Sequence, residues 1–300
     1  MYSDFKKLFR YFLKKYKGIW DMVIVLVLFI LALSSLYAYT QVWPPFVVIE
    51  SSSMQHGYQY KYGIINAGDI VIVKHVTSVN QIQTYVQGEA DGFMSYGEYG
   101  NVILYHENGL TNTVPIIHRA IIYLIWNSSD NAFSAPSLSS LKYNQQWSSP
   151  TRNYNDLQKW LVLYNVGWKN QIVNITLTVL PHHSGFITMG DNNFVQNGGN
   201  YYGIYDQEGL IDIYGNIVQP VMLSWIVGIA QGYIPWVGAI KLYFDGNANY
   251  VPSASWDYLG VVISTLVVIV LAVDYLIPWI RKKNKSKVEN KEDFIKKGFT

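Results

Sequence analysis

Residues 19–39 read IWDMVIVLVLFILALSSLYAY, an apolar run with one charged residue near its start. A helix needs about 20 such residues to cross a bilayer. A second run, at 259–280, also carries one charge, placed close to its end. A cleavable secretory signal has a shorter apolar core that ends at small residues, and the first run lacks both features. We therefore expect retained transmembrane helices at 19–40 and 258–280, with a buried core helix as the alternative for the second.

The basic residues predict how these helices are oriented. Six of the 22 Lys and Arg residues lie in 1–18 and eight lie in 281–300. Basic flanks stay on the cytoplasmic side of a membrane. We therefore expect a cell-membrane protein with both terminal tails in the cytoplasm and an extracytoplasmic domain at 41–257. That domain has no row of Lys and Arg residues that could contact a phosphate backbone, which argues against a nucleic-acid partner.

The sequence between the two runs favours a mostly β domain. Short β-branched segments are separated by Gly, Pro and Asn, as in a series of strands. They lie at 46–49, 69–73, 102–105, 114–125 and 173–180. Residues 127–155 have loop composition instead, and we interpret about 123–180 as an insertion.

Two further segments have other patterns. Residues 156–164 place apolar side chains at a spacing of 3 and 4, which predicts a short amphipathic helix. Residues 221–244 are apolar and aromatic but interrupted by Gly and Pro, which favours strands and turns at a sheet corner beside the lipid surface. The absence of cysteine excludes disulfides, thiolate metal sites and a cysteine nucleophile.

A few polar residues in this domain have the chemistry of a serine hydrolase. Ser53 is the candidate nucleophile and His118 the candidate base, because a serine hydroxyl attacks only when a neighbouring group takes its proton. Asp206 or Asp191 is the candidate carboxylate that orients the imidazole. The Ser53 N–H and the Ser51 hydroxyl are candidate donors to the oxyanion of the intermediate. Each residue alone also has an ordinary explanation, in a turn or a hydrogen-bonded core.

Four short motifs occur in a fixed order along the domain. They are 48–54 (VIESSSM), 68–71 (GDIV), 117–121 (IHRAI) and 186–193 (FITMGDNN). As a set they resemble the sequence boxes of type I signal peptidases of the archaeal and endoplasmic-reticulum kind. The resemblance implies a signal-peptidase-like β catalytic domain in which Ser53 is the nucleophile, Ser51 an oxyanion donor and His118 the base.

The chain departs from that family at two informative positions. The family usually has Pro where this chain has His56, which changes the turn after the nucleophile. The family's catalytic aspartate usually lies where this chain has Asn197. A Gly- and Tyr-rich insertion at 196–204 displaces the counterpart, which we expect to be Asp206, with Asp191 as a supporting carboxylate.

The resemblance implies a membrane-bound serine endopeptidase that removes signal peptides from exported preproteins and uses no cofactor. Its partners are then preproteins, the lipid bilayer and, as a candidate, the Sec translocon. An extended substrate adds to an open strand edge, and position matching places Ile49, Met54, Ile116 and Ile117 near the substrate pockets.

Three alternatives remain open from the sequence. One is a non-catalytic, membrane-anchored surface or accessory protein that retains the fold, and another is a relative dedicated to one surface or pilus substrate. Within the enzyme reading, Lys74 is an alternative base if burial lowers its pKa. The His182-His183 pair is not expected to bind metal, because adjacent strand residues point to opposite faces.

Overall fold

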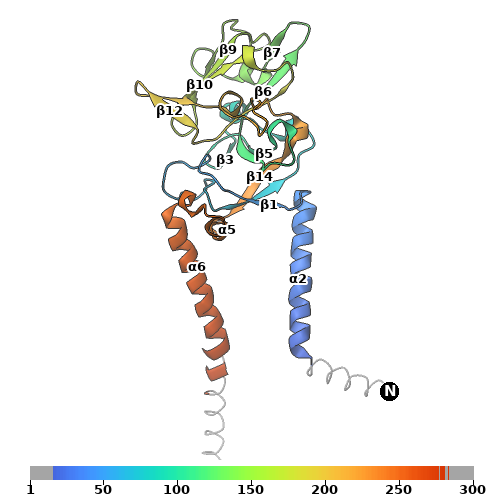
Figure 1. The fold of residues 1–300 in the computed structure, drawn as a ribbon, viewed down its shortest axis with the longest axis vertical. Helices are drawn as coiled ribbons and strands as arrows, with labels where there is room; N and C mark the ends of the chain where they lie inside the picture. The colour runs from blue at the N-terminus through green and yellow to red at the C-terminus, as the bar shows by residue number, and fades with distance from the viewer. Residues whose placement is uncertain (1–15, 277, 281–282, 284–300) are drawn as a thin grey trace, which may run out of the picture.

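The computed structural model describes residues 16–276, 278–280 and 283. The cytoplasmic tails predicted at 1–18 and 281–300 fall almost entirely outside this part of the chain, so they stay predictions. The described residues form a β-rich region with two long helices on one side of it (Figure 1).

These helices are the apolar runs of the sequence. Among the described residues they are long and apolar enough to span a membrane, α2 (Lys17–Thr40) at the N-terminal end and α6 (Ser253–Leu271) near the C-terminal end. α2 ends where Gln41 takes a left-handed conformation (φ 54°) and donates its N–H to the carbonyl of Tyr37. α6 begins earlier than the predicted residue 258 and continues as a π-helical turn at Ala272–Leu276.

The main sheet carries the motifs. Within the described residues it has seven strands, in the order β1-β2-β14-β5-β6-β11, with β7 paired to β6. Its described strand pairs are all antiparallel. Successive side chains along each strand point to opposite faces of the sheet. The strands are β1 (Phe46–Val48), β2 (Ile70–Lys74), β5 (Val102–Tyr105), β6 (Ile116–Asn127), β7 (Ala132–Ser134), β11 (Gly185–Met189) and β14 (Ile226–Ile234).

A second sheet of five strands, counted over the same residues, has the order β12-β13-β10-β9-β8. Its strands are β8 (Trp147–Ser148), β9 (Trp160–Val166), β10 (Gln171–Thr176), β12 (Phe194–Asn197) and β13 (Asn200–Gly203). The remaining elements are the hairpin β3 (Met94–Ser95) and β4 (Glu98–Tyr99), the helices α3 (Tyr85–Asp91), α4 (Asp206–Gly209) and α5 (Ala239–Phe244), and 3₁₀ turns at Val79–Gln81, Glu107–Gly109, Pro136–Ser140, Leu177–Val179, Leu223–Trp225 and Ala248–Tyr250.

The predicted insertion has more structure than its composition suggested. Phe133, Leu138 and Trp147 are buried in a core shared with the second sheet, so the stretch 127–155 is not only loop. The helix predicted over 156–164 is wrong, because most of this segment's apolar residues lie in strand β9, which pairs with β8 and β10. In that strand Leu161 and Leu163 are buried and their neighbours are more exposed, a period-2 pattern that the spacing of 3 and 4 concealed.

The segment 221–244 likewise combines a strand with a helix. β14 is an expected strand and pairs with β2 and β5 within the main sheet, but the chain then forms α5 rather than further strands and turns. The position of this segment beside the lipid surface stays a prediction. Ala239 and Leu242 of α5 are buried against Val251 and Leu259, next to the start of α6. Figure 1 shows α5 on the side of the β-rich region from which both long helices leave.

Candidate active site

Three side chains from distant segments form a hydrogen-bonded line. The Nε2 atom of His118 lies 3.0 Å from the Oγ atom of Ser53, and the Nδ1 atom of His118 lies 2.7 Å from Oδ2 of Asp206. Of the two candidate aspartates, Asp206 is therefore the one that the structure places beside the imidazole. Because each contact is a normal hydrogen-bond length, the arrangement can pass a proton from the serine to the histidine.

The main sheet positions Ser53 and His118, and a hairpin of the second sheet leads to Asp206. Ser53 lies in the turn that follows β1, and His118 lies in β6 opposite Ile103 of β5. Asp206 begins the short helix α4, immediately after the β12–β13 hairpin. His118 and Asp206 are buried, whereas Ser53 is half-buried. The nucleophile candidate is thus reachable while its partners are shielded from water.

The Asp206 carboxylate accepts hydrogen bonds from three side chains. Besides His118, it accepts hydrogen bonds from the Tyr105 hydroxyl at 2.7 Å and from the Thr188 hydroxyl at 2.6 Å. Burial and the neighbouring carboxylate raise the pKa of Tyr105, which keeps its hydroxyl protonated as a donor. Gln207 in turn donates to the Thr188 oxygen. A buried carboxylate with three donors avoids the cost of an unsatisfied charge.

The Ser51 hydroxyl is next to the candidate nucleophile. Its Oγ atom lies 3.1 Å from Oγ of Ser53, and its side chain is exposed. It can therefore turn its proton toward an oxygen bound in front of Ser53. A hydroxyl beside the nucleophile candidate is in reach to serve as an oxyanion donor.

Asp191 belongs to a second network, beside the first. It forms a bidentate ion pair with Arg119, through Nε to Oδ1 at 2.7 Å and Nη2 to Oδ2 at 2.7 Å. Both residues are buried, and Asp191 also accepts from His56 at 3.1 Å. Burial opposes ionisation of Asp191, but the Arg119 guanidinium outweighs it and lowers the pKa of the carboxyl. Asp191 is thus placed as a structural anion, and its supporting catalytic role stays a prediction.

The loop that contains Asp191 is hydrogen-bonded to the turn that carries Ser53. The Asn192 N–H donates to the Ser53 carbonyl at 2.8 Å, and the Asn192 amide donates to the Ser52 carbonyl at 3.2 Å. A Cβ atom at Gly190 would lie 2.7 Å from the Ser53 carbonyl oxygen, so only glycine allows this approach. The motif at 186–193 therefore touches the turn that carries the nucleophile candidate.

A cleft of about 390 Å³ opens in front of Ser53 and His118. Ile49, Ile116 and Ile117 line it, and these are three of the four residues that the resemblance places near substrate pockets. Met54 does not: its side chain is buried in the core of the main sheet, because a long apolar side chain beside a turn is stabilised by burial. The structure therefore does not bring Met54 to the cleft, and its substrate-binding role stays a prediction.

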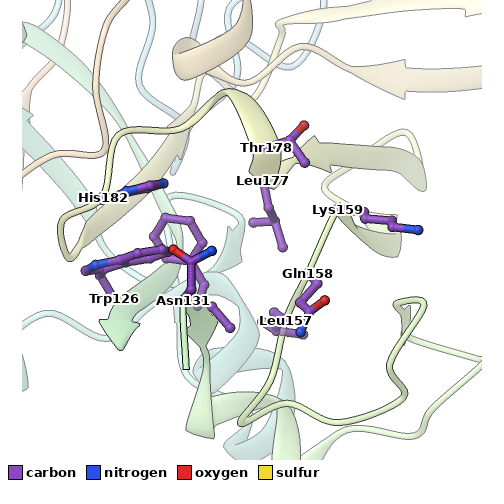
Figure 2. Close-up of a pocket in the computed structure, with 10 residues that line it drawn as sticks. Trp126, Asn131, Leu157, Gln158, Lys159, Leu177, Thr178 and His182 are labelled. Atoms are coloured by element: carbon purple, nitrogen blue, oxygen red, sulfur yellow. The ribbon is translucent and has the colours of Figure 1, made fainter. Parts of the chain in front are cut away.

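The other candidates lie elsewhere. Lys74 places its ammonium over the Tyr39 ring, 4.8 Å from the centroid, and the structure gives it no contact with Ser53. His182 stacks on Trp126 at 4.1 Å between ring centroids, at the rim of a separate pocket in the inserted region (Figure 2). His183 contacts Gln219 instead, at 3.0 Å. No group of three or more potential metal ligands gathers within the part of the chain that the structure describes.

Sequence reasoning missed two of the residues in contact with Asp206. Tyr105 ends an apolar strand and Thr188 lies within another, so both read as ordinary sheet residues. Their separation from Asp206 along the chain gives no local signal. The contact between His56 and Asp191 was also missed. The sequence showed His56 only as a departure from the proline of the family pattern. Comparison with known proteins finds no matching family model and no matching curated protein.

Proposed function

We propose that this chain is a membrane-anchored serine endopeptidase that removes signal peptides, like the type I signal peptidases that its motifs resemble. The observation that carries the proposal is the line Ser53–His118–Asp206, with contacts of 3.0 Å and 2.7 Å at the two imidazole nitrogens. A serine, a histidine and an aspartate in this order form the catalytic unit of many unrelated acyl-transfer enzymes.

The proposed reaction has two halves. In the first, Nε2 of His118 takes the proton of the Ser53 hydroxyl while its oxygen attacks the scissile carbonyl carbon, and the Ser51 hydroxyl with the Ser53 N–H stabilises the resulting oxyanion. The imidazolium, paired with Asp206, then gives its proton to the departing amine. In the second half a water, deprotonated by His118, hydrolyses the acyl-enzyme and releases the signal peptide.

The strands beside the cleft support an extended peptide as the substrate. β1 lies at the edge of the main sheet and pairs only with β2 in the described strand order. β11 pairs with β6 from Arg119 onward, so Ile116 and Ile117 pair with β5 alone. A strand inserted between these two free edges gains main-chain hydrogen bonds from both sides and passes in front of Ser53.

The proposed location follows from the helices and the basic tails. Both long helices leave the β-rich region on the same side (Figure 1), and the Lys and Arg residues gather in 1–18 and 281–300. Cytoplasmic tails then place the β-rich region on the outer side of the cell membrane. The substrate class is exported preproteins, whose signal helices end at this surface, and the Sec translocon is the proposed partner that delivers them.

Cleavage of a preprotein in detergent tests this function. The full chain is incubated with a preprotein whose signal sequence ends in a small-x-small segment, and product is followed by mass. We expect cleavage by the wild type and by Ser52→Ala, and none by Ser53→Ala or His118→Ala. Unchanged cleavage in the last two variants, or no cleavage by the wild type of any preprotein in a panel, favours the non-catalytic accessory protein.

A further inference from the structure

The inserted region reaches the candidate active site through one tryptophan. Trp168 lies in the turn between β9 and β10, far along the chain from the serine cluster. Its ring stacks on the His56 ring, with 5.4 Å between centroids and 10° between planes. His56 is buried and lies just after the nucleophile turn. The stack therefore joins the inserted region to the segment that carries Ser53.

Both rings also converge on Asp191, from two directions. His56 contacts the carboxylate through Nε2, 3.1 Å from Oδ2. Trp168 donates its indole N–H to the Asp191 main-chain carbonyl at 3.0 Å, and Gln171 donates to the same oxygen at 3.2 Å. The inserted region thus fixes the backbone of Asp191, while Arg119 and His56 fix its side chain.

The loop that contains Asp191 also contacts the turn that carries Ser53. The residue that follows Asp191 donates its N–H to the Ser53 carbonyl, and Gly190 packs against the same oxygen. The contacts therefore close a ring that runs from Ser53 to His56, Trp168, Asp191 and back to Ser53. In the described structure the Ser53 hydroxyl contacts His118 and Ser51, and the cleft is lined without His56 or Trp168.

We infer that His56 and Trp168 are positioning residues that hold the Ser53 hydroxyl at its distance from His118. The inference rests on the proposed function, which it deepens by giving the inserted region a role in the reaction. A displacement of about 1 Å between reacting groups can cost about 10²-fold in rate. Loss of the contacts that His56 and Trp168 make with each other and with Asp191 lets the Ser53 turn shift relative to β6. The cleft walls that bind substrate stay in place. The effect is then on kcat and not on KM.

The inserted region supplies its own control. Trp126 and His182 form a second stacked pair, with 4.1 Å between centroids and 6° between planes, beside the pocket drawn in Figure 2. Within the described residues the main-chain N–H of Trp126 donates to the Ser184 hydroxyl, and neither Trp126 nor His182 forms a hydrogen bond with the Asp191 loop. The variant Trp126→Ala removes a comparable stack, and the ring contacts that it removes are with Phe133 and His182 rather than with the Ser53 turn.

The test measures kcat and KM for preprotein cleavage by the full chain in detergent. We expect Trp168→Ala and His56→Ala to lower kcat by about 10- to 100-fold at unchanged KM, and the double variant to be no worse than the more severe single one, because the pair acts as a unit. Trp168→Phe keeps the stack and His56→Gln keeps a donor to Asp191, so both recover part of kcat. Trp126→Ala stays within about twofold of the wild type.

The outcomes separate this inference from the proposed function. A wild type without Ser53-dependent cleavage overturns the function itself. An active wild type with full kcat in Trp168→Ala and His56→Ala overturns only the positioning role, as does an equal loss in Trp126→Ala. If Trp168→Ala does not fold, the milder Trp168→Phe and His56→Gln decide: wild-type kcat in both overturns the inference, and a lower kcat with unchanged KM supports it.

Discussion

Both carboxylate oxygens of Asp206 lie within hydrogen-bond distance of the His118 Nδ1 atom, at 2.9 Å and 2.7 Å. The contact fixes Nδ1 as the protonated nitrogen, because a carboxylate accepts and does not donate. The other nitrogen, Nε2, is then left with a lone pair directed at the Ser53 hydroxyl. This tautomer is the one that can act as a base.

The first prediction concerns that tautomer. In Asp206→Asn the side chain keeps its shape, but an amide N–H can face Nδ1 and favour the wrong tautomer. We expect kcat for preprotein cleavage to fall by about 10⁴-fold with little change in KM, as the equivalent exchange does in a well-characterised serine protease. A loss of less than about tenfold would show that Asp206 does not orient His118.

The second prediction concerns the donors that hold Asp206. Tyr105→Phe removes a hydroxyl that lies 2.7 Å from the carboxylate. Because hydrogen bonds to charged groups contribute about 1.5–3 kcal/mol, we expect a fall in kcat of at least tenfold and a lower thermal midpoint. Tyr123→Phe is the matched control from β6, since the Tyr123 hydroxyl forms no hydrogen bond with another described residue. Equal kcat in the two variants would contradict the prediction.

The third prediction separates Ser51 from Ser52. Ser51 lies 3.1 Å from the Ser53 hydroxyl, whereas Ser52 is held through its backbone carbonyl by Asn192. Ser51→Ala removes a proposed oxyanion donor, and the expected loss in kcat is about 10²- to 10³-fold. Ser52→Ala is expected to keep wild-type kcat, measured with the same preprotein. If both variants cleave equally well, the donor is another group.

How far the sequence predicts this molecule depends on whether a residue's role is local. The apolar runs predict α2 and α6 because length and composition are sufficient for a helix that crosses a membrane. β5 was expected at its observed residues, since Gly and Asn flank a short buried strand. The segment 156–164 was misread, because pairing with β8 and β10 outweighed its helical spacing.

The candidate site divides in the same way. Ser53 and His118 were identifiable because each lies in a short motif that resembles a known family. Asp206 could be identified only by allowing for the insertion at 196–204, and the structure places it beside His118. Tyr105 and Trp168 were beyond reach, since their contacts join segments far apart in the chain and depend on how two sheets meet.

The fourth prediction concerns pH and Asp69, the aspartate of the 68–71 motif. Burial raises the pKa of its carboxyl to about 6, against hydrogen bonds from the N–H groups of Asn66 and Trp236. The folded state then holds more protons than the unfolded state between about pH 4 and pH 6. Stability is present in full below this window and falls as the pH rises through it.

Asp69→Asn removes this titration. Its thermal midpoint relative to that of the wild type is expected to improve as the pH rises from about 4 to about 6, by an amount equivalent to about 1.4 kcal/mol for each unit of pKa difference. The measurement is a series of melting curves in detergent. A difference between the two proteins that stays constant over this range would exclude a raised pKa at Asp69.

The most direct test of the proposed chemistry is covalent labelling of the serine. The full chain is treated with a fluorophosphonate, which reacts with activated serine hydroxyls, and the modified residue is mapped by mass spectrometry. We predict one adduct at Ser53, a rate of labelling reduced at least about 10²-fold in His118→Ala, and no adduct in Ser53→Ala. An unlabelled Ser53 in a folded wild-type protein, or equal labelling rates with and without His118, would contradict the catalytic assignment.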